Sequence, residues 1–157
     1  ATGTELRVAA KIDRADDEYF AREIKHLFEL PHVNYIGEIN DAQKVGFLSN
    51  AKALLVPIDW EEPFGLVMIE AMACGTPVIA FRRGSVPEVI EDGVTGLLVP
   101  VRDSQGLATA IAELAATPDL RRQYGDAGAA RVHREFEQSR QWQAILAHRH
   151  KLLAERA

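Results

Sequence analysis

The chain has 157 residues, of which 47% are hydrophobic and 26% are charged. This length and composition fit a single globular domain over residues 1–157, with enough apolar material for a hydrophobic core. The net charge of −5 lacks the basic footprint of a nucleic-acid-binding protein, and the single cysteine, Cys74, excludes an intramolecular disulfide and a cysteine-rich metal site.

Short apolar runs alternate with helical patterns along the chain. Strands are predicted at residues 6–10, 33–39, 53–58, 76–81 and 95–100. Helices are predicted at residues 13–30, 41–50, 65–74, within 85–93, and at 104–116, 119–135 and 138–154, with breaks allowed at Gly125 and Gly128. Short apolar strands that are each followed by a helix predict an α/β fold with one Rossmann-like parallel sheet of five strands, flanked by helices on both faces.

The predicted helix at residues 65–74 contains almost only apolar side chains and one carboxylate, that of Glu70. A helix that is apolar on all sides is expected to be buried, and a buried carboxylate is destabilising unless it has a partner. Two partners are compatible with the pattern. One is a ligand that donates hydroxyl groups, and the other is a nearby arginine or lysine with a structural role.

The loop before this helix has the features of an anion site. It follows the third strand, at the carboxyl edge where parallel sheets bind ligands. Pro63 keeps the preceding residue extended, and Gly65 allows close approach at a helix N-terminus, which attracts phosphate. Glu62 precedes the helix, and Glu70 lies ~7–8 Å along its axis. A nucleotide sugar matches this layout, with its sugar near Glu62 and its ribose near Glu70.

Several ordered motifs resemble one enzyme family. The segment E-P-F-G-L-V-M-I-E, from Glu62 to Glu70, matches the E-x7-E motif of retaining GT-B glycosyltransferases. The segments VNYIGEI, FLSNAKALLVPIDW, EAMACGTPVIA and GSVPEVIEDGVTGLLVP resemble family 4, also called glycosyl transferases group 1. The resemblance covers about residues 5 to 136 and implies the C-terminal, donor-binding half of a GT-B fold.

The resemblance also implies site residues. Glu62 would be the catalytic residue that contacts the transferred sugar, and Glu70 would bind the ribose hydroxyls. The other donor-binding residues would be Gly37, Glu38 and Ile39 at the base, Phe64, Gly65 and Leu66 at the sugar and phosphate, and Gly84 and Ser85 in a further loop. The family implies no metal and no cofactor, with the nucleotide diphosphate sugar as substrate.

Two family features do not precede Leu6 in this sequence. One is a G-R and a K-G pair whose arginine and lysine hold the diphosphate, and the other is the N-terminal domain that binds the acceptor. We therefore expect the chain alone to be inactive. The helix at about 138–157 would cross to the missing domain, and its uncovered apolar side chains could drive homodimerisation. Alternatively, it folds onto its own sheet.

Some residues allow a functional and a structural interpretation. Lys11 could reach a phosphate or be a solvated loop lysine, and Arg82 or Arg83 could replace part of the missing phosphate clamp. Trp60 could line the cleft or belong to the core. The cluster of Asp13, Asp16 and Asp17 resembles a metal site, but acidic residues at a helix start more often stabilise the helix dipole.

The expected function is that of the donor domain of a retaining enzyme, which moves a sugar from a nucleotide diphosphate sugar to a hydroxyl acceptor. Two alternatives are a GT-B-like nucleotide-sugar epimerase, which needs further catalytic acids, and a non-catalytic nucleotide-binding module. No apolar run approaches the ~20 residues of a membrane span, so we expect a cytoplasmic protein that binds no nucleic acid. Peripheral membrane association of the full-length enzyme is left open.

Overall fold

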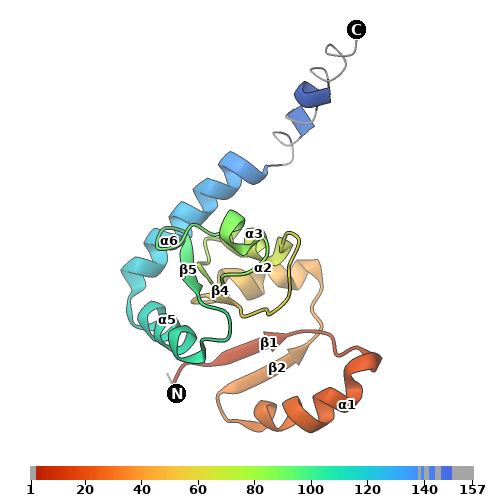
Figure 1. The fold of residues 1–157 in the computed structure, drawn as a ribbon. Helices are drawn as coiled ribbons and strands as arrows, with labels where there is room; N and C mark the ends of the chain where they lie inside the picture. The colour runs from red at the N-terminus through yellow and green to blue at the C-terminus, as the bar shows by residue number, and fades with distance from the viewer. Residues whose placement is uncertain (1–2, 138, 140–141, 144–145, 150–157) are drawn as a thin grey trace. The chain divides into compact units, whose positions relative to one another are not determined.

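The protein is represented by a computed structural model, which describes residues 3–137, 139, 142–143 and 146–149 (Figure 1). It forms two compact units, Ala1–Phe47 and Leu48–Ala157. Each unit contains its own parallel strands and its own helices.

In the first unit, strand β1 (Leu6–Ala9) pairs in parallel with β2 (Val33–Gly37). The chain between them is helical but irregular, with the successive turns η1 (Arg14–Asp16), α1 (Asp17–Tyr19), η2 (Phe20–Ile24) and η3 (Lys25–Glu29). Aromatic packing holds this segment against the strands. The Phe28 ring stacks on Tyr35 of β2 at 4.9 Å and contacts Phe20 at 5.6 Å. Helix α2 (Asp41–Ser49) follows β2, and the boundary between the two units falls within its last turn.

In the second unit, strands β3 (Leu54–Val56), β4 (Val78–Phe81) and β5 (Gly96–Val99) form a parallel sheet in the order β3-β4-β5. Every residue of the central strand β4 is buried, because helices cover both of its faces. Ile79 and Phe81 pack with Leu114 of α5 (Ser104–Ala116) and Tyr124 of α6 (Pro118–Arg131). The alternate β4 side chains point to the opposite face. The remaining helical segments are α3 (Leu66–Ala73), α4 (Val86–Val89) and η4 (Val132–Phe136).

The predicted α/β class with parallel strands flanked by helices is confirmed, and each predicted strand is found within a few residues. The single five-stranded sheet is not found, since the structure pairs the strands as a two-stranded and a three-stranded sheet. Apolar runs separated by helices specify the parallel direction. They do not specify which strands share a hydrogen-bond ladder.

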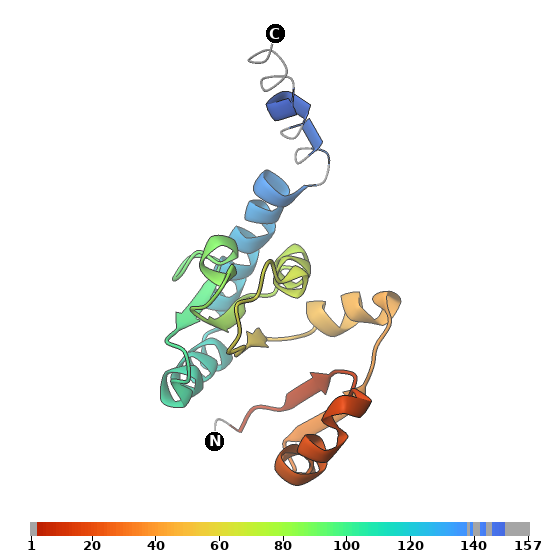
Figure 2. The ribbon, with the colours of Figure 1, turned by 45° about the vertical axis from the view of Figure 1, so that its right-hand side comes forward.

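The breaks that the sequence allows at Gly125 and Gly128 are not found, because α6 runs through both residues without interruption. Their role is close packing, and α6 passes beside α3 in both views (Figures 1 and 2). A Cβ atom at Gly125 would overlap the Gly75 carbonyl group, and one at Gly128 would lie 3.3 Å from the Met72 side chain. The two glycines thus bring α6 against the C-terminal end of α3.

The predicted helix at residues 138–154 lies largely outside the described residues. Of its described side chains, Trp142 and Leu146 are exposed. Among the helices that the structure describes, none is long and apolar enough to cross a membrane.

Candidate functional site

Two loops meet at the carboxyl edge of the second unit's sheet. One joins β3 to α3 and carries Glu62, and the other follows β4 and carries Gly84 and Ser85. The Ser85 amide donates a hydrogen bond to the Glu62 carbonyl at 2.9 Å. Gly84 has a φ of 55°, and a Cβ atom there would lie 2.6 Å from the Glu62 nitrogen. Three predicted site residues are therefore in direct backbone contact.

The carboxylate of Glu62 is held by two donors. Its Oε1 accepts from the Gly65 amide at 3.1 Å, and its Oε2 accepts from the Trp60 indole Nε1 at 3.0 Å. An ionised carboxylate can accept about four hydrogen bonds, so acceptor capacity remains for a ligand hydroxyl. The indole bond was not predicted, because the sequence suggested a Trp60 that lines a cleft or fills the core. Trp60 is 58% exposed, so it does not belong to the core.

The N-terminus of α3 is open to an anion. Gly65, the N-cap, has a left-handed φ of 76°, and no side chain caps the helix there. This conformation favours glycine, and a Cβ atom there would also displace the terminal methyl group of Met68. The Gly65 amide already donates to the Glu62 side chain. The next two amides, those of Leu66 and Val67, lie in the first turn of the helix and have no intrahelical acceptor. Phosphate oxygens are suitable acceptors for them.

The sequence predicts that helix α3 is buried on all sides, and this prediction is wrong. Met68, Ala71 and Met72 form a single buried face, whereas Leu66 is 65% exposed and the helical rotation places half-buried Glu70 beside it. The desolvation cost of the Glu70 carboxylate is thus smaller than for a core position. An apolar sequence cannot distinguish a helix face covered by its own chain from one left open.

The basic side chains considered as phosphate ligands have acidic partners. Arg82 pairs with Asp92 at 2.5 Å, and Arg83 pairs with acids of the loop before α3. In the first unit, Lys11 lies 3.8 Å from Asp13. Each of these cations keeps further N–H donors beside its carboxylate partner, so the pairs do not exclude a phosphate contact.

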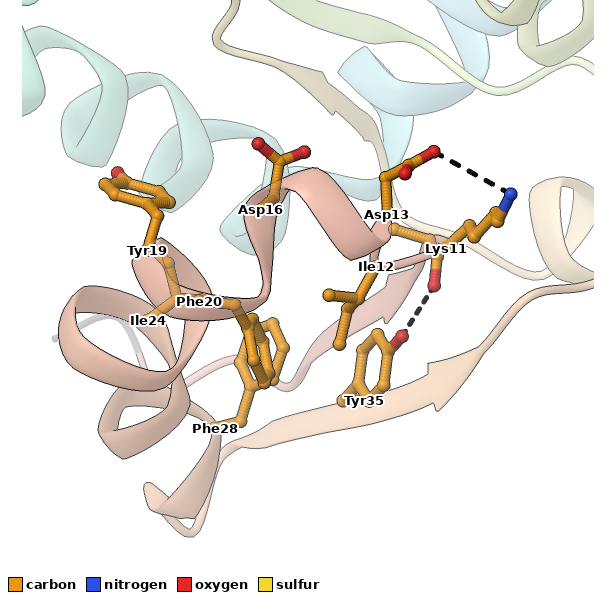
Figure 3. A pocket seen from close by; sticks show the side chains of 10 residues that line it. Lys11, Ile12, Asp13, Asp16, Tyr19, Phe20, Ile24, Phe28 and Tyr35 are labelled. Carbon is orange, nitrogen blue, oxygen red and sulfur yellow. Dashed lines mark hydrogen bonds and ion pairs between the residues drawn. The ribbon is translucent and has the colours of Figure 1, made fainter.

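The first unit contains a pocket that the sequence did not indicate (Figure 3). Phe20, Phe28 and Tyr35 form its wall, and the Tyr35 hydroxyl donates to the Ala10 carbonyl at 2.7 Å. Lys11 lies at its mouth, just past the end of β1. The mixed 3-10, α and π turns that leave this space were not visible in the helical spacing.

The predicted base-recognition residues Gly37, Glu38 and Ile39 lie at the carboxyl end of β2, also in the first unit. Gly37 has a φ of 75°, so the chain turns there in a conformation that favours glycine.

The acidic cluster of the first unit has a local structural role. The Asp13 side chain accepts from the Ala15 amide at 3.4 Å and thereby caps the first helical turn. In the part of the chain that the structure describes, no three histidine, cysteine or acidic side chains are grouped as a metal site would require.

Residues 5–131 match the family model described as Glycosyl transferases group 1. The chain belongs to this family. It is 37% identical over 123 residues to a phosphatidyl-myo-inositol mannosyltransferase of Mycobacterium leprae (strain TN), an alignment that covers 78% of this chain and 32% of the relative.

Solved structures of glycosyltransferases resemble this group 1 domain in fold. The sucrose-phosphate synthase of Thermosynechococcus elongatus matches with 33% identity and a TM-score of 0.79, over 96% of this chain and 38% of that one. The Anabaena protein Alr3699/HepE, in complex with UDP and glucose, matches in fold with a TM-score of 0.83 and 23% identity, over 94% of this chain and 40% of that one. The chain thus spans 32% to 40% of the length of these three proteins.

Proposed function

We propose that this chain binds the nucleotide-sugar donor of a retaining family 4 glycosyltransferase, which transfers the sugar to a hydroxyl acceptor. The observation that carries the proposal is the pairing of an oriented Glu62 carboxylate with the uncapped N-terminus of α3 at one sheet edge. Relatives named as glycosyltransferases and a fold neighbour in complex with UDP and glucose support it.

Each part of the site has a role in this proposal. Glu62 accepts hydrogen bonds from the transferred sugar, and the amides of Leu66 and Val67, together with the helix dipole, stabilise the negative charge of the diphosphate. Glu70, which lies on the open side of α3, accepts bonds from the ribose hydroxyls. Base recognition by residues 37–39 remains a prediction, as does the cytoplasmic location.

The proposed chemistry relies on positioning and electrostatics. The leaving diphosphate accumulates charge as the sugar departs, and fixed amide dipoles stabilise that charge without reorganisation. The same diphosphate helps to deprotonate the acceptor hydroxyl on the face where the new bond forms, which retains the anomeric configuration. Neither metal nor cofactor takes part in this route. The acceptor is bound by a part of the protein outside this chain, so the chain alone is expected to be inactive.

Calorimetric titration of the chain with UDP, GDP and ADP tests this proposal. We expect saturable binding of one nucleotide that is weakened by Glu70→Gln, because the amide accepts fewer hydrogen bonds from the ribose than the carboxylate does. Glu113→Gln, at an exposed position of α5, makes the same charge change away from the site and serves as the control. The proposal fails if none of the three nucleotides binds, even to a longer protein that includes the upstream arginine and lysine.

A further inference from the structure

The guanidinium group of Arg83 joins two acidic side chains of the loop before α3. Its Nη1 lies 2.7 Å from Asp59 Oδ1, and its Nε lies 3.1 Å from Glu61 Oε1. The side chains of Arg83 and Asp59 are only 35% and 30% exposed, so this pair is screened less by solvent than a surface ion pair. Arginine suits this position, because its planar fork can donate to two acceptors at once.

Asp59 is itself shared between two arginines. Its second oxygen, Oδ2, lies 2.6 Å from Arg102 Nε. Arg102 is 82% exposed, so we expect its separate contribution to be small. The shared carboxylate nevertheless fixes the start of the loop to the segments after β4 and β5.

The backbone beside Arg83 contacts the other end of the same loop. The Ser85 amide donates to the Glu62 carbonyl, and Gly84 lies so close to Glu62 that no Cβ atom fits between them. The Arg83 side chain therefore secures the residues just before Glu62, and the backbone that follows it secures Glu62 itself. With both attachments in place, the Trp60 indole reaches the Glu62 carboxylate at 3.0 Å.

We infer that Arg83 is a positioning residue that fixes the orientation of Glu62 through Asp59 and Glu61, and that it is not a ligand of the donor phosphates. The inference rests on the proposed function, which makes Glu62 the residue that contacts the sugar. The guanidinium group of Arg83 donates from two of its nitrogens to carboxylates of the loop before α3, and this directs its planar fork toward that loop. Nucleotide titration separates this role from a contact of its remaining N–H groups with a phosphate.

Trp60 provides a probe of the Glu62 orientation that requires no ligand. The chain contains two tryptophans, so Trp142→Phe leaves Trp60 as the only one. In that background, acrylamide quenching of Trp60 fluorescence is measured for Arg83→Gln, Asp59→Asn and Arg83→Lys. The matched control is Arg82→Gln, which breaks the neighbouring pair with Asp92 instead. Thermal unfolding of each variant identifies any that has lost its fold.

We expect Arg83→Gln and Asp59→Asn to raise the quenching constant by a similar factor, because the indole of Trp60 is no longer held against the Glu62 carboxylate. Arg83→Lys should restore part of the effect, because lysine keeps the charge but lacks the fork. Arg82→Gln should leave quenching unchanged. Unchanged quenching in folded Arg83→Gln and Asp59→Asn would overturn the inference.

Nucleotide titration of the same variants separates positioning from phosphate binding. Positioning predicts that both variants keep the affinity of the unaltered chain for UDP, GDP or ADP within about twofold, since Glu62 contacts the sugar and not the nucleotide. A phosphate ligand predicts that Arg83→Gln weakens binding whereas Asp59→Asn, which removes one of the two carboxylate partners of Arg83, does not, and that result would overturn the inference. If none of the three binds, either to the unaltered chain or to the longer protein, the proposed function fails while the quenching test still decides the role of Arg83.

Discussion

Replacement of Gly125 by alanine tests the packing of α6 against α3. The added Cβ atom would overlap the Gly75 carbonyl oxygen and would lie 2.9 Å from the Gly75 carbonyl carbon, both of which are backbone atoms that a rotamer change cannot move. Gly128→Ala is the matched control in the same helix. Its Cβ atom would lie 3.3 Å and 3.4 Å from side-chain atoms of Met72 and 3.7 Å from the Met72 Cα, without the overlap found at Gly125.

The expected free energies of unfolding follow from two opposing terms. Overpacking typically costs about 1–3 kcal/mol, and alanine gains ~0.8–1 kcal/mol over glycine inside a helix. Because the clash at Gly125 is with backbone atoms, we expect the upper part of the overpacking range, so Gly125→Ala should lower the free energy of unfolding by about 1–2 kcal/mol after the helix gain is subtracted. Gly128→Ala should leave it unchanged or raise it by up to ~1 kcal/mol, because the gain in helix propensity is largely kept.

Thermal unfolding followed by circular dichroism measures this difference. In a chain of this size, 1 kcal/mol corresponds to about 2–4 °C in Tm, so the two variants should melt several degrees apart. Urea titration gives the free energies independently, provided that the slopes agree. A Gly125→Ala chain that is as stable as Gly128→Ala would refute the close approach of α6 to Gly75.

Two further changes have defined outcomes. Gly84→Ala combines a left-handed backbone with a clash against Glu62. We therefore expect it to lower the free energy of unfolding by about 1–3 kcal/mol and to weaken nucleotide-sugar binding in calorimetry. Normal stability together with normal binding would contradict the loop contact. Burial, and then the charges of Glu113 and Asp92, raise the pKa of Tyr124 above 10.0 in the folded chain. The neutral phenol therefore stabilises the fold below pH ~10, and this stabilisation is lost as the pH rises through the pKa of the folded state. Urea unfolding from pH 9 to pH 11 should therefore show a smaller loss of stability in Tyr124→Phe than in the unaltered chain, and equal losses would argue against the raised pKa.

The sequence predicts the elements of the site better than their burial. Periodicity located β3, α3 and β4, and the carboxyl-edge rule placed the loop of Glu62 at the edge where Gly84 follows β4. The burial of α3 could not be predicted, because Leu66 and Met68 are both apolar and only the tertiary contacts decide which face is covered. The same limit applies to Gly125. Glycine in a helical pattern indicates a possible break, whereas the packing of α6 against Gly75 requires a glycine at this position.

Polar contacts between loops also could not be predicted from the sequence. Nothing in the spacing indicates that Arg83 joins Asp59 to Glu61, because these residues are brought together only when β3 and β4 pair. The burial of the Ser85 hydroxyl oxygen could not be predicted either. The resemblance to the family placed Ser85 in a donor-binding loop, and in the structure this oxygen is buried and has no hydrogen-bond partner among the described residues.

The two hydrogen bonds that the Glu62 carboxylate accepts determine what a glutamine at this position would do. Glutamine matches glutamate in shape, yet its side chain offers one oxygen and one NH₂ group. Gly65 and Trp60 each present an N–H to a different oxygen of Glu62. Whichever way the amide is turned, its NH₂ group faces another donor, and one of the two bonds is replaced by repulsion. Glu62→Gln is therefore not an isosteric removal of charge, because it also disturbs the turn that starts α3.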